Sequence, residues 1–227
     1  MDPKDIGIPI KTDDNINQGV NECLTNNPLN KIDKNIYTVI KSVCKIEVSD
    51  GRGSGFLIKF KKNKKDFYCL MTNEHVVDQE KINNKEKITI YYDCEIEKRE
   101  IILDKNKRYI NEYTDNNLDI TIIQILKEDN INKKYFLLPN NNINNYINKK
   151  IYIIQDPHGC LGYSKGKIIK IYKYEITHDV STKAGSSGSP IFLENTKFVI
   201  GIHKQGDKKK KVNYGVLLYP IIIDLKP

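Results

Sequence analysis

Short runs of strand-forming residues recur along most of the chain, and they limit the fold more than any other feature. From Tyr37 onward, runs rich in Ile, Val and Tyr alternate with clusters of Asn, Asp and Gly. Short strands separated by frequent turns are typical of all-β sandwiches and barrels. The first series comprises residues 39–48, 55–60, 67–72, 88–94, 100–103 and 118–126, and the second comprises 151–154, 167–174, 190–193, 198–203 and 214–219. The sequence therefore predicts an all-β fold in two parts.

A polar stretch separates the two series and divides the chain. Residues 139–148 begin with Pro139 and are rich in Asn, so we expect them to link a first barrel over residues 36–138 to a second over 149–227. A chain of 227 residues is long enough to supply both with a core. Residues 1–35 are polar and show no sustained periodicity. We expect an extension that is loosely packed or clamped across the surface as a strap, or that is removed as a pro-segment.

Three short motifs place His, Asp and Ser in settings that suit nucleophilic catalysis. His75 lies in Thr-Asn-Glu-His-Val-Val directly after an apolar run, and Asp119 interrupts the start of another. Ser187 lies in Gly-Ser-Ser-Gly-Ser-Pro, among small residues that allow a tight turn. A serine hydroxyl becomes a strong nucleophile when a histidine accepts its proton and a buried carboxylate orients that histidine. The order His75, Asp119, Ser187 therefore predicts a catalytic triad.

The turn around Ser187 also predicts a site for a developing negative charge. Gly185 and Gly188 let the backbone bend so that the amides of Gly185 and Ser187 point at one spot, where they would stabilise an oxyanion. Each motif alone has a structural explanation as well: a His after a strand, an Asp that caps a segment, or a flexible Gly-Ser loop. Their occurrence together, in this order, favours catalysis.

Together these motifs resemble those of the chymotrypsin-like serine proteases, and the bacterial glutamyl endopeptidases in particular. The resemblance extends over residues 36–224 and includes Gly-Ser-Gly-Phe-Leu-Ile at 53–58 and Gly-Ile-His at 201–203. It implies two six-stranded antiparallel β-barrels with the active site in the cleft between them. His75 and Asp119 would lie on the first barrel and Ser187 on the second. The implied activity is cleavage of peptide bonds through an acyl-enzyme intermediate, with no cofactor.

The resemblance also implies a binding pocket for the substrate residue on the acyl side of the cut bond. Relatives that cleave after Lys or Arg carry an Asp six positions before the nucleophile, where this chain has Ser181. The glutamyl branch has a Thr and a His at positions that map onto Thr182 and His203, so we expect a preference for Glu or Asp. Lys204, Gln205 and Gly206 complete the expected substrate-binding set, although relatives usually have a neutral residue at Lys204.

Two further departures concern the surroundings of the nucleophile. Lys183 and Ala184 replace the Thr and Gly of glutamyl relatives, and Ser186 replaces the Asp that pairs with a new N-terminus in digestive proteases. Two more histidines have no assigned role in the resemblance. We expect His158 to lie in a surface turn, whereas for His178 the sequence leaves contact with substrate open.

Charge, cysteines and the N-terminus bear on partners and location. The formal charge of +8 comes partly from lysines at 59–65 and 208–211, and a basic surface attracts acidic peptides, nucleic acid or anionic membranes. The five cysteines are widely spaced and odd in number, which predicts neither a disulfide framework nor a metal site. The sequence has no long apolar stretch, so we expect no membrane span and, without a signal peptide, an intracellular protein. A removed leader would instead mean secretion.

Two other functions fit the same residues. The first is a catalytically idle module that keeps the barrels and uses its basic face to dock an acidic protein or nucleic acid. The second is a processing or regulatory protease with very few natural substrates, which general peptidase assays would miss. We expect a peptide or protein substrate, an acidic one in particular, and a monomer by default.

Overall fold

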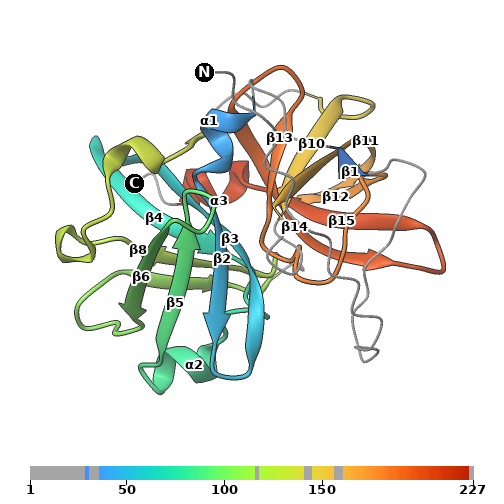
Figure 1. The fold of residues 1–227 in the computed structure, drawn as a ribbon. Coiled ribbons are helices and arrows are strands. Elements are labelled where there is room, and N and C mark those ends of the chain that lie inside the picture. Colours follow the sequence, from blue (N-terminus) through green and yellow to red (C-terminus); the bar gives the residue numbers. More distant parts are fainter. Residues whose placement is uncertain (1–28, 31–35, 116–117, 141–144, 156–160, 225–227) are drawn as a thin grey trace, which may run out of the picture.

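Antiparallel pairing joins most of the predicted runs into two curled sheets (Figure 1). The computed structural model describes residues 29–30, 36–115, 118–140, 145–155 and 161–224. The first sheet contains β2 (Val43–Val48), β3 (Gly51–Lys62), β4 (Lys65–Thr72), β5 (Lys87–Tyr92), β6 (Glu97–Ile102), β7 (Ile110–Tyr113) and β8 (Ile120–Gln124). The second contains β1 (Leu29–Asn30), β9 (Leu138–Pro139), β10 (Lys150–Gln155), β11 (Gly162–Tyr172), β12 (Glu175–His178), β13 (Pro190–Leu193), β14 (Phe198–Asp207) and β15 (Val212–Leu217).

The second sheet is a closed barrel, and the first is a curled open sheet. In the second, the order β11-β10-β13-β14-β15-β12 returns to β11 through antiparallel β11–β12 pairing, which closes a ring of six strands. In the first, seven strands follow the order β6-β5-β2-β3-β4-β8-β7, and no pairing of described residues joins its ends. The predicted all-β architecture with two barrels is confirmed. The first barrel was expected to have six strands; it has seven, and it is a curled half-barrel whose end strands do not pair among the described residues.

Several elements depart from the predicted runs. The run at 39–48 begins in a short helix, α1 (Tyr37–Ile40), and the run at 214–219 ends where helix α3 (Tyr219–Asp224) begins. A third helix, α2 (Gln79–Asn83), follows the His75 motif, and two 3₁₀ turns cover Lys127–Asp129 and Lys133–Tyr135. Strands β7 and β12 were not among the predicted runs. Both are short and largely polar, Ile-Asn-Glu-Tyr and Glu-Ile-Thr-His, so neither stands out as an apolar run.

Three groups of buried apolar side chains hold the sheets together. One fills the first sheet, with Ile46, Leu70 and Ile90 among its members, and another fills the second barrel, with Ile153 and Ile191. The third contains side chains from both sheets and from α1 and α3, so it lies between the barrels. Its members include Val39, Phe56, Met71, Tyr152, Phe192, Val199, Ile221 and Ile222. This shared core fixes the relative position of the barrels.

The segment between the barrels pairs with both of them. Leu137 donates its amide to Leu57 O (2.9 Å) and accepts at its carbonyl from Lys59 N (3.0 Å). The next residue, Leu138, pairs in parallel with Phe198 of β14. The predicted linker begins at Pro139, inside β9, and its residues 141–144 lie outside the described ones.

Part of the N-terminal extension also joins the second sheet. Strand β1 pairs antiparallel with β11, with Leu29 opposite Ser164 and Asn30 opposite Tyr163. The rest of residues 1–35 lies outside the described part of the chain. Its use as a strap or pro-segment therefore stays a prediction, as do the exact boundaries of both barrels.

Candidate active site

The register of β4 and β8 brings His75 and Asp119 together. These strands are antiparallel, and the pair at this end of the ladder is Thr72 with Thr121. Strand β4 therefore leaves the sheet just before the turn that carries His75, and β8 enters it just after Asp119. Two residues that are distant in sequence consequently lie at the same edge of the first sheet.

Asp119 contacts His75 at two points. Its Oδ2 atom lies 2.8 Å from Nδ1 of the His75 ring, and its Oδ1 atom accepts a hydrogen bond of 3.0 Å from the His75 backbone amide. The Asp119 side chain is 13% exposed and that of His75 is 47% exposed. The carboxylate therefore holds one ring nitrogen and leaves Nε2 for another partner, as an orienting carboxylate does in serine proteases.

Two further side chains hold this pair in place. Asn73 donates from Nδ2 to the Asp119 carbonyl (2.8 Å), and Thr121 donates from its hydroxyl to Val77 O (2.8 Å). Asp119 has a φ of 49°, in the left-handed region that non-glycine residues rarely adopt. The Asn73 bond stabilises that conformation. Sequence reasoning missed both side chains because their partners are distant in the chain.

The Ser187 turn is tight and depends on two glycines with positive φ. These angles are 90° for Gly185 and 89° for Gly188. Ser186 N donates to Lys183 O (3.0 Å), and Ser189 N donates to Ser186 O (3.0 Å), which closes the turn around Ser187. Among the described residues, neither the Gly185 amide nor the Ser187 amide donates to another protein group. Both remain able to bind an oxyanion.

The Ser187 hydroxyl donates to the carbonyl of Lys204 (3.1 Å). Strands β14 and β15 shift register between His203 and Gln205, so Lys204 is the extra residue of a bulge. Within the described residues Ser187 makes no hydrogen bond to His75. Catalytic contacts are often long in the absence of substrate and tighten when it binds.

Four of the five predicted specificity residues, 203–206, lie within β14, and Thr182 lies in the loop that precedes the Ser187 turn. Thr182 and His203 are almost completely buried, at 1% and 0% exposure. Lys204 is half-buried, Gln205 is exposed and Gly206 is buried. Thr182 and His203 are therefore not reached from solvent in this conformation.

A second buried histidine lies against His203. His178 Nε2 is 3.4 Å from His203 Nδ1, and the two rings meet edge to face with centroids 5.4 Å apart. Burial lowers the pKa of His178 well below its ordinary value, and the neighbouring His203 lowers it further. His178 is therefore neutral near pH 7. The other histidine without an assigned role, His158, lies outside the described residues.

A network of neutral hydrogen bonds lies beneath the Ser187 turn. The Ser186 hydroxyl donates to Gln155 Oε1, and Gln155 Nε2 donates to Ser164 Oγ (3.1 Å) and to Ser181 O (3.0 Å). Ser186 stands where digestive proteases have an Asp that forms an ion pair. In this chain the residue at that position, Ser186, instead forms a neutral hydrogen bond with the side-chain amide of Gln155. Nothing in the sequence pointed to Gln155 or Ser164.

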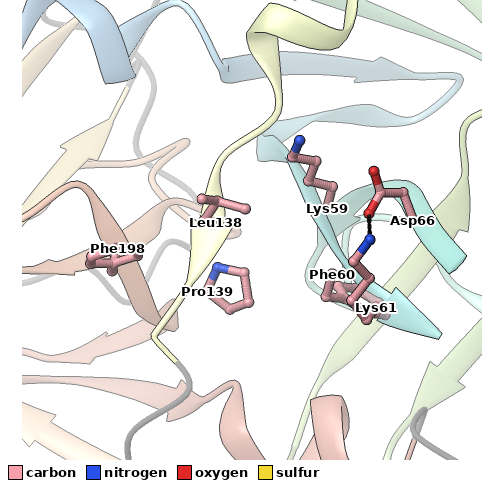
Figure 2. A pocket seen from close by; sticks show the side chains of 7 residues that line it. All are labelled: Lys59, Phe60, Lys61, Asp66, Leu138, Pro139 and Phe198. Carbon is pink, nitrogen blue, oxygen red and sulfur yellow. Dashed lines mark ion pairs between the residues drawn. The ribbon is translucent and has the colours of Figure 1, made fainter. Parts of the chain in front are cut away.

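A separate small cavity lies between the first sheet and β9. Its volume is about 200 Å³ and it is lined by Lys59, Phe60, Lys61, Asp66, Leu138, Pro139 and Phe198 (Figure 2). Lys61 and Asp66 form an ion pair at 2.6 Å on its rim. None of the residues predicted for the active site lines this cavity.

Cysteines and possible metal ligands are dispersed. Cys44 and Cys69 are free and buried, which raises the pKa of both thiols, and Cys94 is exposed. Cys23 and Cys160 lie outside the described residues, so the absence of disulfides stays a prediction. In the part of the chain that the structure describes, no group of three or more His, Cys, Asp or Glu could hold a metal ion. No described helix is long and apolar enough to cross a membrane.

Comparison with known proteins defines the family. Residues 53–202 match the trypsin-like peptidase domain, which is more than half of the chain, so this chain belongs to that family. No individual curated protein matches its sequence. The family match covers all three predicted triad residues.

Solved structures share the fold at low sequence identity. A Glu endopeptidase aligns with a TM-score of 0.65 and 16% identity over 87% of this chain and 94% of its own. The protein Deg5 aligns with a TM-score of 0.61 and 14% identity over 86% and 95%. The serine protease of a human pathogenic astrovirus aligns with a TM-score of 0.57 and 18% identity over 80% and 91%. The chain is therefore similar in fold to these three proteins.

Proposed function

We propose that this protein is a serine endopeptidase in which Ser187 is the nucleophile, His75 the general base and Asp119 the residue that orients it. The observation that carries the proposal is the contact of Asp119 with both the ring and the backbone of His75, at 2.8 and 3.0 Å. A carboxylate that fixes Nδ1 sets the tautomer in which Nε2 can accept a proton.

The steps of the reaction follow from these roles. Ser187 Oγ attacks the substrate carbonyl carbon while its proton passes to His75 Nε2, and the amides of Gly185 and Ser187 bind the resulting oxyanion. The C–N bond then breaks as His75 returns the proton to the leaving amine. Water, activated by the same histidine, hydrolyses the acyl-enzyme and releases Ser187.

We also propose that the enzyme prefers Glu or Asp on the acyl side of the cut bond. A substrate carboxylate that leaves water needs fixed donors in exchange, and Thr182 and His203 can supply a hydroxyl and a ring N–H. Lys204 and the lysines at 208–211 add a positive field nearby. Since Thr182 and His203 are buried beforehand, the preference requires the pocket to open for the carboxylate.

A fluorophosphonate probe tests the catalytic part, because it labels an activated serine whatever the substrate preference. We expect the wild-type protein to be labelled and Ser187→Ala to remain unlabelled, with turnover reduced by about six orders of magnitude. Ser189→Ala is the matched control, because it removes a neighbouring hydroxyl of the same turn, and we expect it to be labelled. A labelled Ser187→Ala protein would exclude Ser187, and an unlabelled wild type would favour the binding module.

A peptide library tests the acidic preference separately. A neutral glutamine has nearly the shape of glutamate but gains no charge-assisted hydrogen bond, so we expect Glu to be favoured over Gln by about 10- to 100-fold. His203→Ala should remove most of that preference. Equal cleavage after Leu, Phe or Gln, or an unchanged profile in His203→Ala, would contradict the acidic pocket and leave the catalytic proposal intact.

A further inference from the structure

Ser54 forms a two-point contact between the first barrel and the nucleophile turn of the second. Its backbone amide donates to Ser187 O (2.8 Å), and its hydroxyl donates to Gly185 O (2.7 Å). The two acceptors are the carbonyls of the two residues whose amides are proposed to bind the oxyanion. Ser54 itself is completely buried.

The register of β3 explains why Ser54 is available for this contact. Strand β4 ends at Thr72, which pairs with Gly55 of β3. The preceding residue of β3, Ser54, therefore lies beyond the β4 ladder on that side. Its amide binds the Ser187 turn where a further residue of β4 would otherwise pair.

Gly188 packs so closely against Ser54 that no side chain fits between them. A Cβ atom on Gly188 would lie 2.0 Å from the Ser54 carbonyl oxygen and 2.8 Å from the Thr72 hydroxyl oxygen. The Thr72 hydroxyl in turn donates to the same Ser54 carbonyl (2.7 Å). Thr72, Ser54 and the Ser187 turn thus form one continuous set of contacts.

The Ser54 hydroxyl restrains Gly185, a residue whose backbone conformation needs support. A glycine at a φ of 90° has no side chain to hold its peptide groups and rotates more freely than any other residue. The hydrogen bond from Ser54 Oγ fixes the carbonyl of Gly185. The bond from Ser54 N fixes the carbonyl of Ser187. The peptide unit that carries the Ser187 amide lies between these two fixed carbonyls.

We infer that Ser54 is a positioning residue for the oxyanion site, whose hydroxyl holds the Gly185 peptide so that the amides of Gly185 and Ser187 converge. The inference rests on the proposed function, because it assigns those amides to the oxyanion. Ser54 does not touch the reacting atoms. Its effect is confined to the transition state, where negative charge develops on the substrate oxygen.

The test removes the hydroxyl and keeps the backbone amide. Ser54→Ala and Ser54→Gly should lower kcat by about 10- to 100-fold with little change in KM, because a misplaced donor weakens only the transition state. Affinity for a peptide aldehyde, which forms a hemiacetal oxyanion with the nucleophile, should fall by the same factor as kcat/KM. Ser54→Thr keeps a hydroxyl at this position and should recover most of both values.

Thr196→Val is the matched control. Thr196 likewise donates its hydroxyl to a backbone carbonyl, that of Leu193, at 2.9 Å, but in the turn between β13 and β14. We expect it to leave kcat and aldehyde affinity unchanged. Wild-type kcat in both Ser54→Ala and Ser54→Gly would overturn the inference. So would a lower kcat without a matching loss of aldehyde affinity, which would indicate general destabilisation.

An NMR measurement separates this inference from the proposed function. The amide signals of Gly185 and Ser187 should shift in Ser54→Ala and return toward wild-type positions in Ser54→Thr, whether or not the protein cleaves peptides. An unlabelled wild type in the fluorophosphonate assay would reject the proposed function. Unchanged Gly185 and Ser187 signals in Ser54→Ala would reject the positioning by Ser54.

Discussion

Replacing Asp119 by Asn tests the geometry of the triad with a change of almost no volume. Asp119 accepts two hydrogen bonds from His75, one from the backbone amide at 3.0 Å and one at Nδ1 of the ring at 2.8 Å. An Asn side chain has one oxygen and one NH₂ group, so it can accept only one of them. The His75 backbone amide can only donate, so it binds the Asn side-chain oxygen. The NH₂ group then faces Nδ1, which must become an acceptor.

This exchange reverses the tautomer of His75. With its proton on Nε2, the ring cannot accept the proton of Ser187, a defect that costs about 10⁴ in turnover in a Ser-His-Asp protease. A factor of 10⁴ corresponds to about 5.5 kcal/mol of transition-state free energy. Folding should suffer far less, because a charge-assisted bond exceeds a neutral one by only about 1 kcal/mol. For a chain of this size, the expected decrease in Tm is about 2 to 4 °C.

The assay measures kcat on the best library peptide, the rate of fluorophosphonate labelling and Tm by thermal unfolding. Asp104→Asn is the matched control, because Asp104 also accepts from a backbone amide, Asn106 N at 3.0 Å, and faces a cation, Lys85 Nζ at 3.4 Å. We expect it to keep full activity. A folded Asp119→Asn protein with turnover within about tenfold of wild type would refute the orienting role of Asp119.

Three further predictions concern stability. Burial lowers the pKa of His178, so below about pH 6.5 the unfolded chain binds a proton that the folded chain does not. The contribution of this group to the free energy of unfolding should therefore be fully present above about pH 6.5 and fall by up to about 1.4 kcal/mol per pH unit below it. Urea unfolding from pH 7 to 5 should reveal this loss, and an equal pH dependence in His178→Asn would contradict it. Arg108→Ala should lower the free energy of unfolding by about 3 to 5 kcal/mol, because it leaves the buried Asp129 carboxylate without the guanidinium that contacts it at 2.8 and 3.0 Å. A loss below about 1 kcal/mol would show that solvent screens this pair. Reductant should hardly change Tm, whereas a structural disulfide would contribute about 2 to 4 kcal/mol; a large decrease would reveal a crosslink.

Much of the fold and of the candidate site follows from local features of the sequence. Alternating apolar residues and turn signals predicted most strands, because the two-residue period of a strand is visible in a short window. The predicted run at 190–193 agrees residue for residue with β13. Local composition also marked the Ser187 turn, since Gly185 and Gly188 take the positive φ values that favour glycine. His75 and Asp119 were recognisable because each directly flanks an apolar strand.

Tertiary structure alone decided which distant groups meet. Ser54 and Gly185 are 131 positions apart, and their hydrogen bond depends on the end of the β3–β4 ladder and the packing of the two barrels. The contact of His178 with His203 likewise depends on the pairing of β12, β15 and β14 around the closed barrel. Strand register and sheet closure result from burial summed over the whole chain, and no local window contains that information. The sequence therefore identified the candidate catalytic groups, and only the packed barrels determined which residues hold them in place.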